Sequence, residues 1–381
     1  MCLKCTHSFF RILLYLATSI IPLLTLGKPR ARDLGIQFSG TTGKWNSITD
    51  VAGVEVGYTT IIKGKGALKV GKGPVRTGVT AVHPRGRNNF GKVFAGYFSL
   101  NGNGEMTGSH WVEESGFLEG PIMITNTHNV GTVIDAVIAW SLINNPNGYP
   151  ISLPVVAETW DGRLNDINGF HVNQKEIFHA LNSAKSGPLE EGNIGGGTGM
   201  VAFQFKGGTG TSSRLLPKDE GGYTVGVIVQ ANFGRRSQLT ISGVAVGKTI
   251  DDLMPEIHNQ KIKGSSIIVV VGTDAPLLPY QLKRVAKRVT LGLARPGAVS
   301  SNSSGDIFIA FTTTNLDQTD TNLTMSAPFL KNKTLTPIFE ATIQATEEAI
   351  INAMIAAETM TGINGNTIYA IPHNRLLELF R

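Results

Sequence analysis

The chain has 381 residues, of which 41% are hydrophobic and 16% charged, and its formal net charge is +6. This hydrophobic content excludes an intrinsically disordered chain and fits a large globular domain with a sizeable core. Lysine and arginine are scattered without a block of five or six like charges, so we expect no nucleic-acid partner.

The first segment, residues 1–27, is predicted to be a secretory signal peptide. Lys4 and Arg11 precede a mainly hydrophobic run at 12–26, a pattern typical of such signals. The run is short for a membrane span, which needs about 20 residues. Because no A-x-A cleavage site precedes Lys28, an uncleaved membrane anchor is the alternative. The sequence therefore predicts a periplasmic or secreted protein.

Residues 28–381 are expected to form a single domain, since no repeat, linker or abrupt change of composition interrupts them. Both cysteines, Cys2 and Cys5, lie in the predicted signal. The mature chain would then have no thiol for a disulfide, a nucleophile or a zinc site. The eight histidines have no metal-ligand spacing, and no dinucleotide fingerprint is found. We expect neither a metal nor a cofactor.

Hydrophobic runs of strand length recur along the rest of the chain. They lie at residues 78–82, 121–125, 151–158, 223–230, 267–271 and 307–311. Several are too continuous to have a solvent-exposed face, which predicts strands buried on both sides. Two sheets packed together between helices would bury them in this way.

Helical patterns are clearest in two places. Hydrophobic residues at helical spacing run from Tyr280 to Val289. A second helix is predicted to begin after an N-cap at Thr336 and to continue to Gly362. The glycine-rich loop at 195–199 predicts a backbone that approaches another element or a substrate closely.

A pair of serines stands at the entrance of one of the buried strands. Ser265 and Ser266 directly precede the run that starts at Ile267, and Gly264 before them permits a tight backbone turn. A hydroxyl nucleophile needs a base. Cutting the chain before a serine supplies one, because the new α-amine lies beside the hydroxyl.

Two further polar groups lie at strand ends. Ser304 and Asp306 precede the strand at 307–311, and their spacing puts both side chains on one face of an extended segment. The alternative is an ordinary turn that Ser and Asp cap. Asn232 ends the strand that starts at Tyr223, and its amide could donate to an oxyanion, although Asn before an aromatic residue and Gly is also an ordinary turn.

These motifs resemble the P1 family of self-processing aminopeptidases, peptidase family S58, which includes the DmpA and β-peptidyl aminopeptidase group. The resemblance extends over almost all of the chain after the predicted signal. Its motifs lie at 30–35, 101–108, 125–131, 158–162, 195–200, 230–234, 267–276, 345–350 and 369–373.

The resemblance implies a four-layer αββα sandwich of the Ntn-hydrolase type, in which a precursor cuts itself before a serine or threonine. The nucleophile falls on the serine pair. We favour Ser266, because its spacing leads to Ser304 and Asp306, and Ser265 is the alternative. The expected products are residues 28–265 and 266–381.

The resemblance also implies roles for the other residues. Asn232 would hold the oxyanion, and Ser304 with Asp306 would orient the freed amine and relay protons, although Asp306 stands where the family often has the longer Glu. Trp160 stands at the position where the family has an aromatic residue with a hydroxyl group, and its indole can donate only through N–H.

The substrate class follows from the same resemblance. The expected substrates are small peptides and amino-acid amides or esters. Their N-terminal residue could be an α-, a β- or a D-amino acid. Their ammonium group requires an acidic partner, for which Glu158 and Glu105 are the candidates. A homo-oligomer, a tetramer, is expected. The alternatives are an amidohydrolase of non-peptide amides and an uncleaved, non-catalytic homologue.

Overall fold

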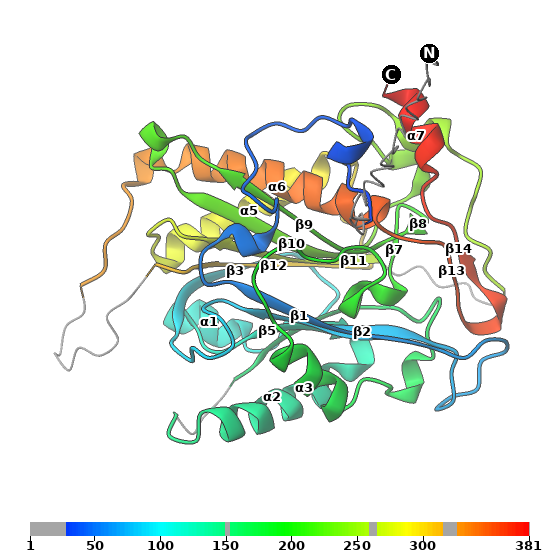
Figure 1. The fold of residues 1–381 in the computed structure, drawn as a ribbon, viewed down its shortest axis with the longest axis horizontal. Helices are drawn as coiled ribbons and strands as arrows, with labels where there is room; N and C mark the ends of the chain where they lie inside the picture. The colour runs from blue at the N-terminus through cyan, green and yellow to red at the C-terminus, as the bar shows by residue number, and fades with distance from the viewer. Residues whose placement is uncertain (1–27, 149–152, 259–264, 315–325, 381) are drawn as a thin grey trace, which may run out of the picture.

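The computed structural model describes residues 28–148, 153–258, 265–314 and 326–380. The predicted signal peptide lies outside the described residues. Two sheets lie face to face between two layers of helices (Figure 1). The αββα sandwich expected from the resemblance is therefore confirmed. Among the described residues, no helix has the length and apolar character that crossing a membrane requires.

The larger sheet has six strands in the order β4-β3-β12-β11-β10-β9. Strands β11 and β12 run parallel, and every other neighbouring pair in this sheet is antiparallel. The strands are β3 (Val93–Gly102), β4 (Phe117–Leu118), β9 (Gly208–Leu215), β10 (Thr224–Asn232), β11 (Ser265–Thr273) and β12 (Ser304–Thr312).

The smaller sheet has the order β1-β2-β5-β6. Its strands are β1 (Glu55–Lys63), β2 (Val75–His83), β5 (Ile122–Asn126) and β6 (Val155–Thr159), and helices α2 (Val130–Asn144) and α3 (Gln174–Asn182) cover its outer face. Helices α5 (Pro279–Ala294) and α6 (Thr336–Ile355) cover the larger sheet. The smaller elements are α1 (Ser109–Ser115), α4 (Val246–Thr249), α7 (His373–Leu379), β7 (Val201–Ala202), β8 (Phe205–Lys206), β13 (Met360–Thr361) and β14 (Thr367–Ile368).

Strand β11 contributes to two hydrophobic cores at once. Ile267 and Val269 pack in the cluster below α5 and α6, whereas Ile268 and Val270 pack in the cluster between the sheets. Because side chains alternate along a strand, each face of β11 is filled separately. This double burial explains why the run at 267–271 has no polar residue, and it confirms the predicted buried strand.

The structure corrects the predicted end of the last long helix. Helix α6 begins at Thr336, with Leu335 as its N-cap, and ends at Ile355 instead of Gly362. A Cβ atom on Gly362 would overlap the backbone of Leu164. This glycine therefore allows two segments to pack closely, and it does not stop the helix.

The glycine-rich loop at 195–199 is a buried 3-10 turn between the two sheets. A Cβ atom on Gly196 would overlap the Gln230 side chain of β10, and one on Gly197 would overlap the backbone of Thr209 in β9. The close approach predicted from the glycines is confirmed, and the neighbours are other elements of the fold.

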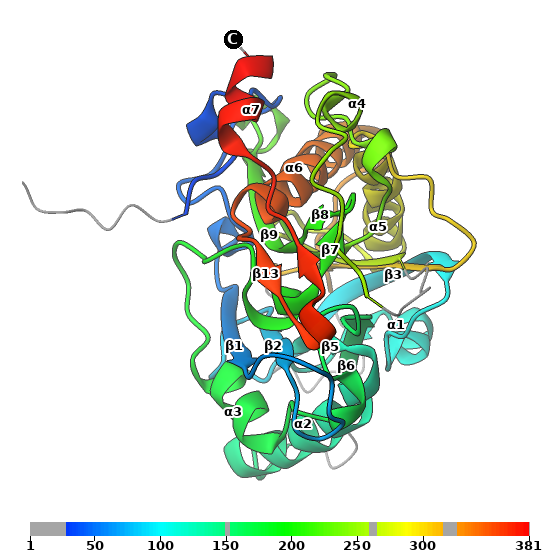
Figure 2. The same cartoon turned by 90° about the vertical axis from the view of Figure 1, so that its right-hand side faces the viewer.

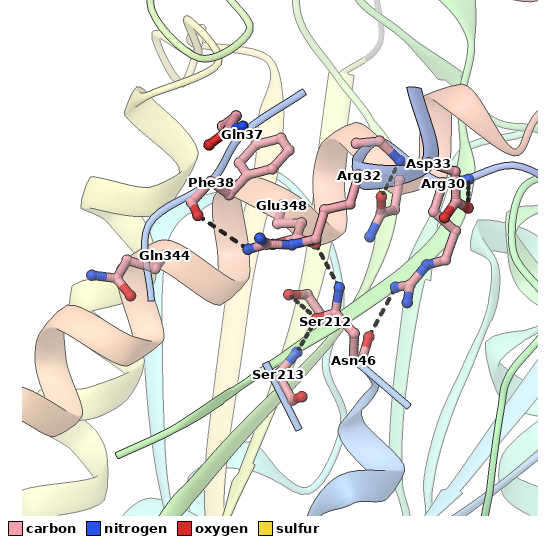
Figure 3. A network of polar contacts seen from close by, with 12 residues as sticks. Arg30, Arg32, Asp33, Gln37, Phe38, Asn46, Ser212, Ser213, Gln344 and Glu348 are labelled. Atoms are coloured by element: carbon pink, nitrogen blue, oxygen red, sulfur yellow. Dashed lines mark hydrogen bonds and ion pairs between the residues drawn. The ribbon is translucent and has the colours of Figure 1, made fainter. Parts of the chain in front are cut away.

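A buried ion network fastens the N-terminal segment to α6 and β9 (Figure 3). Arg32 donates from Nε and Nη2 to the two carboxylate oxygens of Glu348, each at 2.8 Å, and Arg214 donates from Nη2 to Oε2 at 2.7 Å. Asn46 donates to the same carboxylate. Although burial acts to raise the pKa of Glu348, Arg32 and Arg214 hold it below its usual value.

We expect Glu348→Gln to destabilise the fold by about 3–5 kcal/mol, because it leaves two guanidinium groups without their buried counter-ion. A carboxylate with a lowered pKa stabilises the fold above its unfolded pKa of about 4.3 and loses this contribution as the pH falls. The difference between wild type and variant in urea unfolding should therefore shrink below that pH. Glu340→Gln, at an exposed position of the same helix, is the control. Equal stability of the Glu348→Gln variant and wild type would contradict the role of the network.

Candidate active site

Three strand ends meet at one edge of the larger sheet. The parallel strands β11 and β12 both start there, and the antiparallel strand β10 ends there. In this register Ser266 lies opposite Asn232 on one side and opposite Gly305 on the other. Residues separated by up to about 70 positions in the sequence are thus brought together, as their strand-end positions suggested.

The Ser266 hydroxyl lies against the peptide bond that the resemblance expects to be cut. Its Oγ donates to the carbonyl oxygen of Ser265 at 2.7 Å. The backbone N–H of Gly305 donates to the same Oγ at 3.3 Å. Ser266 is only 6% exposed, so its hydroxyl is largely shielded from competing water.

Ser304 and Asp306 form the pair expected from their spacing. Ser304 Oγ lies 2.7 Å from Asp306 Oδ2, and Asn101 Nδ2 donates to Ser304 Oγ at 3.2 Å. A register shift between Asp306 and Ile307 leaves Leu100 of β3 without a partner residue on β12. The strand is irregular at the position where the shorter aspartate replaces the family's glutamate.

Asp306 is a buried acid with spare capacity to accept hydrogen bonds. Its Oδ1 atom has no hydrogen-bond partner within the described parts of the chain. Burial raises the pKa of Asp306, and the Ser300 and Ser304 hydroxyls together with the Ile267 backbone oppose this effect. An amine placed beside Oδ1 would find an acceptor there.

The structure corrects one part of the argument for Ser266. Ser304 lies opposite Ser265, and the residue opposite Ser266 is Gly305. By strand alternation, Ser304 and Asp306 share the helix-side face with Ser265, whereas Ser266 faces the space between the sheets. The spacing of Ser266 therefore does not bring its side chain onto the face that carries the acid pair, because paired residues of neighbouring strands point the same way.

Asn232 is held by backbone groups at both ends of its amide. Its Oδ1 accepts from the Val201 N–H at 2.9 Å, and its Nδ2 donates to the Trp160 carbonyl at 2.9 Å. These contacts assign the oxygen and nitrogen of the amide. Since Nδ2 carries two hydrogens, one remains for another acceptor. Asn232 lies directly opposite Ser266, so both side chains face the space between the sheets.

The structure distinguishes between the two acidic candidates. Glu158, on β6, is 4% exposed, and burial raises its pKa. Its Oε1 accepts from the Glu105 N–H at 3.1 Å and its Oε2 accepts from the Thr127 hydroxyl. Glu105 itself is exposed, so it contributes its backbone N–H and Glu158 contributes the buried carboxylate.

Glu158 also lies near the serine. A Cβ atom on Gly104 would stand 3.2 Å from Glu158 Oε1 and 3.1 Å from the Cα atom of Gly305. Gly305 in turn touches the Ser266 hydroxyl. Gly104 thus allows the segment that carries Glu105 to pack closely between the carboxylate and Gly305.

Trp160 enters the site through its backbone and not through a hydroxyl. Its carbonyl accepts from Asn232, and the guanidinium of Arg163 lies 5.5 Å from its ring centre. The indole ring therefore packs against a cation where the family has an aromatic hydroxyl.

A cavity of about 860 Å³ opens at this edge of the sheet. Ser265 and Asp306 are among its lining residues, and Phe233, Met254 and Val299 provide apolar walls. The cavity therefore adjoins the Ser265–Ser266 bond from the side that carries Asp306. Such a volume lies within the usual range for small-molecule sites. Sequence reasoning missed Gly305, Asn101 and Thr127, although the last two belong to motifs that the resemblance had pointed to.

Comparison with known proteins supports one assignment. The model of peptidase family S58 matches residues 46–368. The chain belongs to peptidase family S58. The β-peptidyl aminopeptidases BapA of Sphingosinicella microcystinivorans and Sphingosinicella xenopeptidilytica are 52% and 46% identical to it, covering 93% and 97% of this chain and 92% and 95% of their own lengths.

Solved structures agree with this S58 assignment. The L-aminopeptidase D-Ala-esterase/amidase of Ochrobactrum anthropi, a serine aminopeptidase with a variant Ntn-hydrolase fold, superimposes with a TM-score of 0.85 at 46% identity, over 92% of this chain and 97% of its own. A Burkholderia β-aminopeptidase gives a TM-score of 0.84 at 42% identity, over 93% and 98%. The chain is therefore a serine aminopeptidase with an Ntn-hydrolase fold.

We expect Glu158→Gln to lower kcat/KM for substrates with a free amino group by at least about thirtyfold, because losing one partner of a buried charged pair costs about 2–5 kcal/mol. Steady-state kinetics with aminoacyl p-nitroanilides measures the effect. Glu105→Gln, the exposed neighbour, should change kcat/KM by less than about twofold. Equal losses in the two variants would contradict the choice of Glu158.

Proposed function

We propose that this aminopeptidase matures by cutting itself between Ser265 and Ser266, so that Ser266 becomes the N-terminal nucleophile of residues 266–381. The observation that carries the proposal is the position of the Ser266 hydroxyl, which lies 2.7 Å from the carbonyl oxygen of Ser265 and directly opposite Asn232. The hydroxyl thus lies beside the bond to be cut, and the Asn232 amide lies on the same face of the neighbouring strand.

In the precursor, Ser266 Oγ attacks the carbonyl carbon of Ser265. The oxyanion is stabilised by the free N–H of Asn232 Nδ2. Collapse of the intermediate breaks the C–N bond, and the proton lost by Ser266 Oγ passes to the backbone nitrogen of residue 266, which becomes an amine. Water then hydrolyses the resulting ester, which releases the Ser265 carboxylate and regenerates the Ser266 hydroxyl.

In the mature enzyme, the α-amine of Ser266 is the base. An α-amino group has a pKa of about 7.7–8.0, so a useful fraction is neutral near pH 8. It accepts the Oγ proton while Oγ attacks the substrate carbonyl, and then gives that proton to the leaving amine. Asn232 holds the oxyanion in this step as well. Water then hydrolyses the acyl-enzyme ester, which releases the N-terminal residue of the substrate and regenerates the Ser266 hydroxyl.

The side-chain faces give the acid pair a specific task. Ser304 and Asp306 lie on the opposite face of the sheet from the Ser266 side chain, while the backbone nitrogen lies in the plane of the sheet. We therefore assign the pair to the nitrogen: Asp306, with its unpartnered Oδ1, and Ser304 orient the freed amine. This is the role that the resemblance implies for the pair.

The substrates are short peptides and amino-acid amides or esters with a free amino group. The Glu158 carboxylate binds the ammonium, and the cavity of about 860 Å³ holds the remainder of a small substrate. The names of the BapA relatives support β-amino acids as N-terminal residues. The Ochrobactrum enzyme, named for L-aminopeptidase and D-Ala-esterase/amidase activity, supports α-amino acids as well.

Two further properties belong to the proposal. Export of the chain would remove residues 1–27 and place the enzyme in the periplasm or outside the cell. The family resemblance supports a homo-oligomer, a tetramer. N-terminal sequencing of the larger fragment tests the first property, and light scattering of the purified protein tests the second.

Intact mass of the purified protein tests the cut. We expect two fragments that meet between Ser265 and Ser266 in wild type and in Ser265→Ala, and a single uncut chain without aminopeptidase activity in Ser266→Ala. Thermal unfolding of each variant shows whether the uncut chain is folded. Cleavage that persists in Ser266→Ala, or an uncut wild type with full activity, would overturn the proposal.

A further inference from the structure

A completely buried lysine lies behind the Asn232 amide. Lys206, on β8, is 0% exposed, and its Nζ donates to the carbonyl oxygens of Met200 and Gly207, each at 2.8 Å. Within the described ranges, no carboxylate lies within the 4.0 Å of an ion pair with it. Burial lowers the pKa of Lys206 to about 7. The two carbonyl oxygens accept from Lys206 whether it is charged or neutral, and because its pKa is about 7 the charge is lost as the pH rises above that value.

Burying an ammonium without a counter-ion costs several kcal/mol, and a neutral side chain would avoid that cost. Strongly perturbed groups of this kind concentrate at functional sites. The position of Lys206 relative to the site is therefore informative.

One peptide group connects Lys206 with Asn232. The carbonyl of the Met200–Val201 peptide accepts from Lys206 Nζ, and the N–H of the same peptide donates to Asn232 Oδ1 at 2.9 Å. An N–H donor at the carbonyl oxygen polarises the peptide, most strongly when the donor is charged, and makes the peptide N–H a stronger donor, because hydrogen bonds in a chain strengthen one another. The Asn232 amide is polarised in turn, and its Nδ2 becomes a stronger donor.

The peptide is also fixed in position relative to β10. The hairpin of β7 and β8, on the side facing the viewer in Figure 2, packs against the end of this strand. Phe203 N–H donates to the Phe233 carbonyl at 2.6 Å, and a Cβ atom on Gly207 would overlap the carbonyl of Ala231. The hairpin therefore contacts the residues on both sides of Asn232.

We propose that Lys206 is a positioning residue that strengthens and orients the Asn232 oxyanion donor through the Met200–Val201 peptide. The inference rests on the proposed function, because it requires Asn232 to bind the oxyanion. Lys206 itself touches neither the substrate nor the reacting atoms.

The test uses Lys206→Gln, which keeps N–H donors and removes the charge, and Lys206→Met, which removes both. We expect kcat for an aminoacyl p-nitroanilide at pH 7 to fall about tenfold in the Gln variant and further in the Met variant, with KM changed by less than about twofold, because the oxyanion forms only after binding. The loss in the Gln variant should shrink at higher pH, where Lys206 is neutral because its pKa is about 7. Lys175→Gln, at an exposed position on α3, should match wild type. A loss confined to KM, or no loss in folded protein, would overturn the proposal.

A double-mutant cycle with Asn232→Ala shows whether Lys206 acts through Asn232. If it does, adding Lys206→Gln to Asn232→Ala lowers kcat no further. If Lys206 has a general structural role instead, the fold-losses in kcat of the two single variants multiply in the double variant. Multiplied losses, or absence of folded protein in both Lys206 variants, would overturn the inference and leave the proposed function intact. An Asn232→Ala variant with wild-type kcat would instead refute the proposed oxyanion role. Where a variant matures too slowly for steady-state kinetics, the same cycle is measured on the rate constant of self-cleavage.

Discussion

The register of three neighbouring strands determines the site. Strand β11 runs parallel to β12 and antiparallel to β10, and this pairing places Ser266 between Gly305 and Asn232. A shift of one residue would turn the Ser266 side chain to the opposite face of the sheet. The alternating hydrophobic residues of β11 prevent such a shift, because Ile267 and Ile268 belong to different cores. The packing of the sandwich thus also positions the nucleophile.

The two faces of this sheet edge have separate chemical tasks. Between the sheets lie the Ser266 hydroxyl, the Asn232 amide and the buried Glu158, which in the proposed mechanism bind the oxyanion and the substrate. On the helix side lie Ser304 and Asp306, which in the same proposal orient the amine. The connection from β11 to β12 through α5 makes this division possible, since a parallel pair requires a crossover helix that covers one face.

Much of this arrangement could be predicted from the sequence, and the remainder could not, for physical reasons. The spacing of Ser304 and Asp306 is enough to place both on one face, because alternation is a local property of a strand. The residue opposite Ser266 depends on the pairing of two strands separated by a helix, and no local pattern specifies it. The burial of Glu158, in contrast to Glu105, likewise depends on contacts between distant segments. Lys206 lies in a short hairpin without a periodic hydrophobic pattern, so the neighbouring sequence gives no sign that its side chain is buried or near the site.

The order of strands in the larger sheet has a consequence for the lifetime of the mature enzyme. The proposed cleavage before Ser266 would assign the central strands β11 and β12 to one polypeptide and their neighbours β10 and β3 to the other. Once such interleaved chains unfold and separate, their reassembly becomes a bimolecular reaction that slows on dilution. The processed protein would then persist because it unfolds slowly, and its durability would be described by a half-life instead of an equilibrium constant.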